Sequence, residues 1–510
     1  MILRSTIVRW ALFCWCQGRG AFAFQPLAHP RYPISSKIPH PSHGTNLIAL
    51  QSSTLDDTSS GYTRKSDSDE GLSAYMSENY RYAFMEPLLQ WAVNSGVEFA
   101  PGTEIVADLE GDWGVELVEP KQQGSAVLTI PSEMILSTKD FQGTRIQQWM
   151  QDNMSDSYCL PECLLVLRLL EEVSKGGASP WQPWLESLPT DFTTGLFLDS
   201  FERAHVARMA PKFLEQHEKQ WQTCSALVMK VVRDSDNILP APFRKWLALQ
   251  PNLSKTIQWA FSIILTRSWR TPDGSQATLV PMGDMFNHNS LMANVRPCFR
   301  ASDNALQLCT TEDIECSQEQ PAGIYLSYGL GHQPARFLVN FGFCDTSAPL
   351  IDVHLDRYLQ RNGLPPINDE KTWPPFDPSH LVVSADNGVI AEDLWVIFLL
   401  KVLRERDPAQ IKRIQKAYDS DDENVLSELV EELFEDWELP VTMELKNHFD
   451  DLLTKVYPEM TFSKHEHLAH PRLVMIEKYN SCMRETFLKT REYLNLVAEQ
   501  TSKDLTNARL

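Results

Sequence analysis

The hydrophobic pattern changes along this chain, and the change limits the possible folds more than any other feature. Between residues 97 and 343 many apolar residues occur in short runs broken by glycine or proline, as in short strands. The apolar run at 126–130, for example, ends at Pro131. Beyond about residue 380 the apolar residues recur at helical spacing. The pattern predicts an α+β region followed by an all-α region.

The clearest helical stripe lies between residues 425 and 437. Its apolar members follow an i, i+1, i+4, i+5 spacing and are Val425, Leu426, Leu429, Val430, Leu433, Phe434 and Trp437. We expect all seven on one face of a helix, with acidic residues on the opposite face. Similar stripes at 449–457 and 473–494 predict further helices.

These patterns divide the chain into four parts. Residues 1–55 form a leader, and 56–75 form a linker whose Ser, Thr, Asp and Gly cannot bury enough apolar surface to fold. Residues 76–348 form the α+β domain, which contains a helical insertion at about 140–270. Residues 349–510 form the helical domain.

The charge balance narrows the range of partners. The chain has 46 Lys and Arg against 67 Asp and Glu, a formal net charge of -21. Such a charge repels nucleic-acid backbones, so we expect no nucleic-acid partner. The first 55 residues are an exception because they contain basic residues and no acid.

That leader resembles a targeting sequence. The apolar run from Ile7 to Cys16 is interrupted by Arg9 and is far shorter than the ~20 residues of a membrane span. It is followed by Ala21-Phe22-Ala23-Phe24 and a basic stretch rich in Ser, Pro and His. This arrangement resembles the bipartite leader of plastid proteins in algae with secondary plastids. A plain secretory signal is the alternative. We expect no membrane span in the mature protein.

The sequence predicts no metal site and no disulfide scaffold. The ten cysteines are scattered without Cys-x-x-Cys pairs, so we expect most of them to be small buried residues. His465-Glu466-His467-Leu468-Ala469-His470 lacks the second histidine at i+4 that a zinc-binding helix needs. We expect a solvated loop there.

Three ordered segments carry the functional signal. The first is Leu279-Val280-Pro281-Met282-Gly283-Asp284-Met285-Phe286-Asn287-His288-Asn289, followed by Ile324-Tyr325-Leu326-Ser327-Tyr328-Gly329 and then Asn340-Phe341-Gly342-Phe343. Together they resemble SET-domain methyltransferases of the Rubisco large-subunit lysine methyltransferase type. Segments at 181–188, 259–268 and 472–494 extend the resemblance to about residues 80–500. It implies a SET-domain β-fold with a helical insertion, followed by an all-α substrate-binding domain.

The resemblance implies S-adenosyl-L-methionine as cofactor and assigns roles to individual residues. Tyr328 matches the catalytic tyrosine, while Asn287 and His288 match cofactor contacts, which we expect to be buried. Arg267 corresponds to a basic residue near the cofactor carboxylate. Methyl transfer from a sulfonium to an amine mainly requires alignment, loss of water and a neutral amine, so no metal is needed.

Two positions depart from the family pattern. The cofactor loop reads Glu110-Gly111-Asp112-Trp113-Gly114, one residue longer between its glycines than the usual form. Trp113 and Gly114 remain the candidates for cofactor binding in it. The second tyrosine of the family is Phe341 here, in the expected substrate site. The missing hydroxyl could change the number of methyl groups added or the residue that accepts them.

We therefore expect a plastid protein-lysine N-methyltransferase that acts as a monomer on a folded protein such as Rubisco large subunit or an aldolase. Histidine methylation is the alternative within the enzyme class, because one branch of the family modifies histidine. A catalytically silent SET-like module that binds a protein is the alternative from another class.

Overall fold

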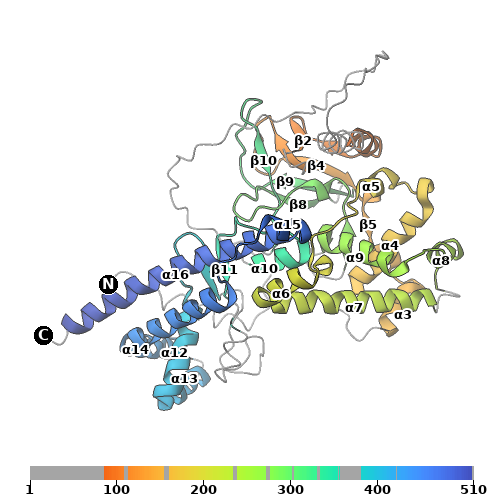
Figure 1. The fold of residues 1–510 in the computed structure, drawn as a ribbon. Coiled ribbons are helices and arrows are strands. Elements are labelled where there is room, and N and C mark those ends of the chain that lie inside the picture. The colour runs from red at the N-terminus through yellow and green to blue at the C-terminus, as the bar shows by residue number, and fades with distance from the viewer. Residues whose placement is uncertain are drawn as a thin grey trace.

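The computed structural model describes residues 85–107, 113–153, 160–233, 238–270, 276–300, 304–329, 333–353, 355, 381–420 and 422–507 (Figure 1). The predicted leader and linker, and residues 110–112 of the predicted cofactor loop, lie outside these ranges. The described part begins with a helical segment at 85–94.

Strands from distant parts of the chain pair into small antiparallel sheets. The largest has the order β1-β4-β9-β8, formed by Glu98–Phe99, Ala126–Pro131, Ala305–Thr310 and Val295–Arg300. A second has the order β10-β3-β2, formed by Ala322–Ile324, Trp113–Leu117 and Thr103–Ala107. A third has the order β5-β7-β6, formed by Leu136–Ser137, Ala277–Leu279 and Ser268–Arg270. Because each sheet combines strands from before and after the helical insertion, residues on both sides of the insertion belong to one α+β unit.

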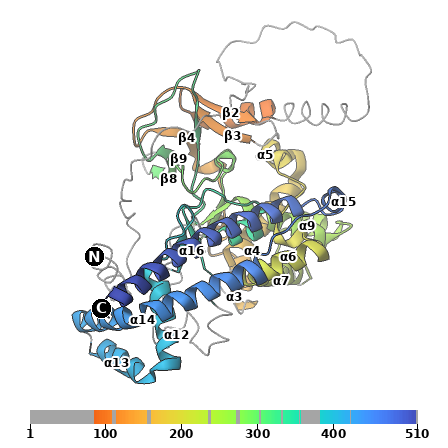
Figure 2. The same cartoon turned by 60° about the vertical axis from the view of Figure 1, so that its left-hand side comes forward.

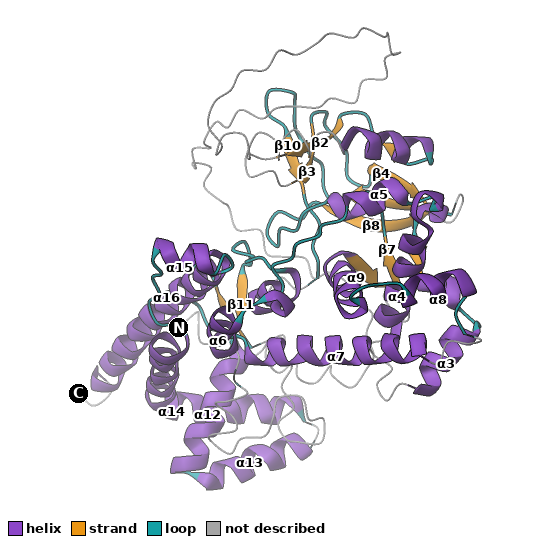
Figure 3. Ribbon diagram, turned by 45° about the vertical axis from the view of Figure 1, so that its right-hand side comes forward, coloured by secondary structure: helices purple, strands orange, loops and turns teal. Residues whose placement is uncertain are grey.

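A block of helices connects β5 to β6 (Figure 3). It comprises α3 (Arg145–Asn153), α4 (Leu160–Lys175), α5 (Gln182–Ser187), α6 (Ser200–Met209), α7 (Pro211–Arg233), α8 (Ala241–Ala248) and α9 (Leu253–Arg267). Helix α4 is apolar on nearly all sides and packs against α7, α8, α9 and β5. A helix that is hydrophobic all round has to be covered by other elements. Helix α4 is therefore the centre of the insertion.

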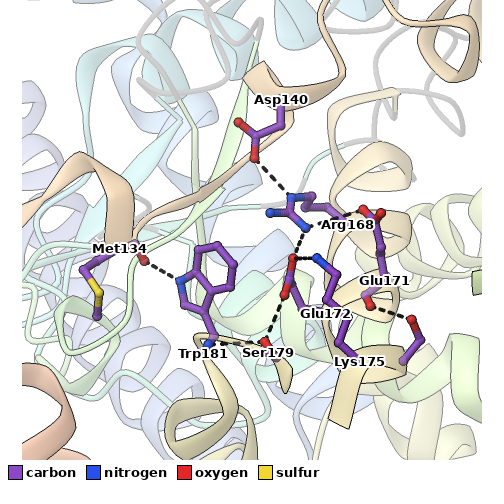
Figure 4. A network of polar contacts seen from close by, with 9 residues as sticks. Met134, Asp140, Arg168, Glu171, Glu172, Lys175, Ser179 and Trp181 are labelled. Atoms are coloured by element: carbon purple, nitrogen blue, oxygen red, sulfur yellow. Dashed lines mark hydrogen bonds and ion pairs between the residues drawn. The ribbon is translucent and has the colours of Figure 1, made fainter. Parts of the chain in front are cut away.

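The turn before α5 is anchored on α4 by a polar network (Figure 4). The buried Glu172 carboxylate forms an ion pair with Arg168 and accepts a hydrogen bond from Ser179 Oγ at 2.9 Å. Trp181 Nε1 donates to the carbonyl oxygen of Met134 at 2.9 Å, and its ring lies 5.4 Å from the Arg168 guanidinium carbon. These contacts fix the start of α5, the helix that carries a tryptophan into the candidate site.

Beyond the sheets the chain is mainly helical. The π-helical turn η9 (Phe337–Phe341) follows the short helix α10 (Pro334–Arg336), and β11 (Leu350–Asp352) pairs with β12 (Val382–Ser384). The remaining elements are α12 (Glu392–Arg406), α13 (Pro408–Asp419), α14 (Glu423–Asp451), η11 (Leu452–Val456), α15 (Lys464–Ala469) and α16 (Leu473–Asn507). Helices α14 and α16 pack side by side (Figure 2). The predicted stripe lies within α14, and of its seven residues Val425 is 48% exposed. Val425 lies in the first turn of α14, and the buried face begins with Leu426.

The described residues form two hydrophobic cores. The first joins the sheets β1–β10 to α4, α7 and α9. The second is built mainly by α12, α13, α14 and α16, but it also includes Val206 and Met209 from α6 and Leu338 and Val339 from η9. Part of the insertion and the segment η9, which follows the predicted site residue Tyr328, therefore pack with the helical region.

One arginine joins the two regions by hydrogen bonds. The Arg472 guanidinium, at the start of α16, donates to the carbonyl oxygen of Phe192 at 2.9 Å, and its backbone N–H donates to the buried carboxylate of Glu202 at 2.9 Å. The neighbouring His470 hydrogen-bonds Asp199 at 2.6 Å. The helical region thus holds the segment between α5 and α6, which also lines the candidate site.

The expectation of a loop at the histidine-rich segment is wrong. Residues Lys464–Ala469 form helix α15, which begins with a capping box between Ser463 and Glu466. That box satisfies backbone N–H groups at the helix start. Among the described residues no group of His, Cys, Asp and Glu is arranged to hold a metal ion, and no described cysteine forms a disulfide. No described helix is long and apolar enough to cross a membrane.

Candidate active site

The segment after β7 turns sharply before it reaches the predicted site residues. Met282 has a positive φ of 68°, which is uncommon for a residue with a side chain. A Cβ atom on Gly283 would lie 2.8 Å from Val280 Cγ1, so only glycine fits there without movement. The turn continues into a short 3₁₀ helix, η8 (Gly283–Met285), and brings Asp284 to the site.

Asn287 connects this segment to β3. Its Nδ2 donates to the carbonyl oxygen of Trp113 at 2.8 Å, so two predicted cofactor-binding positions lie in contact. Gly114 is next to them, because a Cβ there would be 3.4 Å from Asn287 Nδ2. Asn287 is an exposed residue. The expectation that it is buried is therefore wrong, since its amide lies at the rim of a cavity rather than in a core.

The His288 side chain is buried and its ring is hydrogen-bonded within the protein. The side chain is 1% exposed. Its Nε2 lies 3.0 Å from Asp345 Oδ2, and its Nδ1 lies 3.1 Å from the backbone nitrogen of Tyr328. The ring also stacks on Phe337 with 4.4 Å between centroids. Both ring nitrogens therefore have protein partners, and the imidazole has no further hydrogen-bonding atom for a ligand.

Tyr328 is held at both ends. Its Oη donates to the carbonyl oxygen of Phe286 at 2.9 Å, while its backbone N–H donates to His288. Burial raises the pKa of the Tyr328 phenol to about 12, with a smaller lowering by Arg267 and a smaller raising by Asp284. The phenol therefore stays protonated at neutral pH and acts as a hydrogen-bonding group rather than as a base.

Arg267 is paired with a carboxylate that sequence reasoning did not select. Its Nη1 donates to Asp284 Oδ2 at 2.9 Å, and the same oxygen accepts a hydrogen bond from Trp184 Nε1 at 3.2 Å. The Asp284 side chain is 3% exposed and that of Arg267 is 30% exposed. Asp284 thus orients an arginine that remains partly open to the cavity. Its position within Pro-x-x-Asp-x-x-Asn-His was the signal that could have identified it.

Phe341 belongs to an aromatic cluster beside Tyr328. The two ring centroids are 5.4 Å apart, and Phe337 and Phe343 complete the cluster. Gly342 ends η9 with a positive φ of 77°, and its carbonyl oxygen accepts a hydrogen bond from Thr193 Oγ1 at 2.9 Å. The segment between α5 and α6 therefore supports the backbone that carries Phe341.

Three cavities meet at Tyr328 and Phe341. The largest, about 1140 Å³, is lined by the predicted residues Trp113, Arg267, Asn287, His288, Tyr328 and Phe341, together with Trp184 and the segment 186–193. A cavity of about 300 Å³ is lined by the aromatic residues Trp269, Phe286, Tyr328 and Phe341 and by the charged residues Arg267, Arg270 and Asp284, among others. A third, about 260 Å³, includes Glu162, Arg270 and Asn340. The geometry provides one large site and smaller ones that share a tyrosine and a phenylalanine at their boundary.

The chain was compared with known proteins. No protein-family model matches it. Among curated proteins, the actin-histidine N-methyltransferase of Danio rerio is 23% identical over 274 residues, which is 52% of this chain and 43% of that protein. The Mus musculus protein of the same name is 23% identical over 283 residues, 54% of this chain and 44% of that protein. The match thus spans less than half the length of these relatives.

Solved structures match over more of the chain. Rubisco LSMT bound to AdoMet aligns with a TM-score of 0.53 and 14% identity, covering 82% of this chain and 93% of that one. Rubisco LSMT bound to sinefungin and monomethyllysine gives 0.53, 13% identity and the same coverage. The SET domain of LSMT bound to MeLysine and AdoHcy gives 0.52 and 13% identity, again over 82% and 93%. The predicted α+β fold class with a helical C-terminal region is confirmed, and the chain has the SET-domain fold of the Rubisco LSMT structures.

Proposed function

We propose that this chain is an S-adenosyl-L-methionine-dependent protein N-methyltransferase. The observation that carries the proposal is the position of Tyr328, whose side chain lies where the large cavity meets two smaller ones. A methyltransferase needs this arrangement because donor and acceptor have to approach each other from separate sites in line. The names of the sequence relatives and the fold of the structural neighbours support the same reaction class.

The residues around the large cavity fit the cofactor. Arg267 offers guanidinium N–H groups that Asp284 orients, and a guanidinium is a good partner for a carboxylate. The amide of Asn287 and the Trp113 end of β3 lie at the same cavity. When bound, S-adenosyl-L-methionine supplies an electrophilic methyl group on a cationic sulfur.

The residues of the chain would then prepare the acceptor. Burial keeps the Tyr328 phenol neutral, so its oxygen can serve as a hydrogen-bond partner that orients an amine without itself transferring a proton. The surrounding aromatic side chains exclude water from the acceptor. A desolvated amine beside a cation has a depressed pKa, which favours the nucleophilic neutral form.

We propose lysine as the acceptor. The lining of the 300 Å³ cavity includes the aromatic residues Trp269, Phe286, Tyr328 and Phe341, and aromatic faces attract ammonium and methylammonium groups. The same cavity is also lined by the charged residues Arg267, Arg270 and Asp284. Histidine is the second candidate because the curated relatives are named actin-histidine N-methyltransferases. Rubisco large subunit and aldolase are the substrates we propose to test first.

Methyl labelling tests the function directly. The purified chain is incubated with labelled S-adenosyl-L-methionine and a plastid protein extract, and separately with Rubisco, aldolase and actin, and modified residues are mapped by mass spectrometry. We expect label on lysine of a plastid protein. Label on histidine would overturn the lysine assignment only. Binding of S-adenosylhomocysteine without any transfer to these substrates would favour a silent binding module.

We also propose that residues 1–55 direct the protein to a plastid, on the basis of their basic, acid-free composition. A reporter fused behind these residues should enter the plastid of an alga with a secondary plastid. Retention of the reporter in the secretory pathway, or its export, would overturn this proposal.

A further inference from the structure

A buried carboxylate lies behind the candidate active site and receives hydrogen bonds from two segments of the chain. Asp345 Oδ2 is 3.0 Å from His288 Nε2 and accepts from Ser290 Oγ at 2.5 Å. Asp345 Oδ1 accepts from the hydroxyl of Ser347 at 2.6 Å and from its backbone N–H at 2.9 Å. The Asp345 side chain is 3% exposed. The cluster is therefore a buried carboxylate with donors on both oxygens.

The carboxylate is ionised at any working pH. Burial by itself would raise the pKa of Asp345, but the hydrogen bonds from His288, Ser290 and Ser347 lower it to about 2. An ionised carboxylate can only accept hydrogen bonds. The proton in the contact between Asp345 and His288 must therefore be on Nε2 of the histidine.

The position of that proton decides what the other ring nitrogen can do. His288 Nδ1 lies between a donor, the Tyr328 N–H at 3.1 Å, and an acceptor, the Leu326 carbonyl oxygen at 3.2 Å. In a neutral ring with the proton on Nε2, Nδ1 is an acceptor and takes the Tyr328 N–H. The opposite tautomer would donate to Leu326 and leave the Tyr328 N–H facing another N–H.

We propose that Asp345 is a positioning residue for Tyr328. By holding the proton of His288 on Nε2, it keeps Nδ1 available to the backbone of Tyr328 and so fixes the residue whose phenol reaches the acceptor. The phenol is fixed independently by Phe286, so the two contacts together set the direction of the ring. This inference rests on the proposed methyltransferase function, because it assigns the contact between Asp345 and His288 a role in turnover.

If Asp345 positions Tyr328 through His288, the variant Asp345→Asn should change kcat more than it changes substrate or cofactor binding. The amide is nearly the same size, but its NH₂ group can donate to His288 Nε2 and thereby favour the opposite tautomer. We expect kcat to fall by about 10- to 100-fold, as for other residues that orient a functional side chain through a second one. The KM for the protein substrate and the affinity for S-adenosylhomocysteine should change less than about threefold by the same argument, because Asp345 does not line the cavities.

Asp313→Asn is the matched control. Asp313 also accepts a backbone hydrogen bond, from Gln123 at 2.7 Å, but it is exposed and lies outside the site. The kcat of Asp313→Asn should equal that of the wild type. An equal loss in both variants would show that the substitution acts through general effects, and would overturn the proposal.

The tautomer itself is measured by nitrogen NMR of the full chain labelled with ¹⁵N-histidine, with His288 assigned by its loss in His288→Gln. We expect the proton on Nε2 in the wild type and a shift toward Nδ1 in Asp345→Asn. A wild-type ring with its only proton on Nδ1 would overturn the proposal even if Asp345→Asn failed to fold. An altered tautomer in Asp345→Asn with an unchanged kcat would also overturn the proposal. A chain without methyl transfer would refute the proposed function. The tautomer of His288 would still be testable in that chain, because the NMR measurement needs no activity.

Discussion

Tyr328→Phe removes only the phenol hydroxyl, which donates to the carbonyl oxygen of Phe286 at 2.9 Å. Loss of this neutral hydrogen bond should lower the free energy of unfolding by about 0.5–1.5 kcal/mol, because the buried carbonyl loses its donor. The effect on turnover should be larger, about 10²-fold or more in kcat, if the oxygen orients the acceptor amine in the transition state. That difference corresponds to about 2.7 kcal/mol in the barrier.

The assay separates these two effects. Steady-state methyl transfer gives kcat and KM, titration calorimetry with S-adenosylhomocysteine gives cofactor affinity, and chemical denaturation gives stability. Tyr457→Phe is the control, because Tyr457 is also buried and donates to a backbone carbonyl, that of Met209 at 3.3 Å, in the second core. We expect Tyr457→Phe to lose stability and keep kcat. An unchanged kcat with a raised KM in Tyr328→Phe would refute the reasoning, since the phenol would then contribute only to binding.

Phe341→Tyr should shift products toward monomethyl-lysine in mass spectra, because its hydroxyl would place a polar atom beside the acceptor where the cavities meet. An unchanged distribution of methyl states in an active variant would contradict this. Gly342→Ala should destabilise the fold by about 1–3 kcal/mol in denaturant titrations and lower kcat, because the residue has positive φ and its Cβ would lie 2.7 Å from the Thr193 carbonyl carbon. Burial lowers the pKa of His217 and of His448 to about 4, so stability should be complete above about pH 6.5 and fall as the pH drops toward 4, by up to about 3 kcal/mol for each histidine. Thermal melts across this range check it, and replacing His217 with glutamine should flatten the decline.

Local patterns predicted much of the secondary structure. The run at 126–130 is strand β4, and the long apolar stripe lies within α14. The α15 helix was missed although its signal was present, because Ser463 and Glu466 form the capping-box spacing directly before it.

Burial was less predictable than periodicity. Val425 satisfies the helical spacing and is nevertheless exposed, because spacing defines a face of a helix but not the residue at which a neighbouring element begins to cover that face. Asn287 lies at a cavity rim for a similar reason. Its exposure depends on how β3 approaches it, and β3 is more than 150 residues earlier in the chain.

The sequence by itself led to the reaction class we propose, through the resemblance of the ordered motifs around Asn287, His288 and Tyr328 to those of SET-domain methyltransferases. Only the tertiary structure decided what these residues do for one another. It showed that His288 uses its ring to join Asp345 to the Tyr328 backbone, and that Asp284 orients Arg267. Periodicity reports local geometry, whereas the direction of a hydrogen bond between residues 40 or 57 positions apart depends on how distant segments pack.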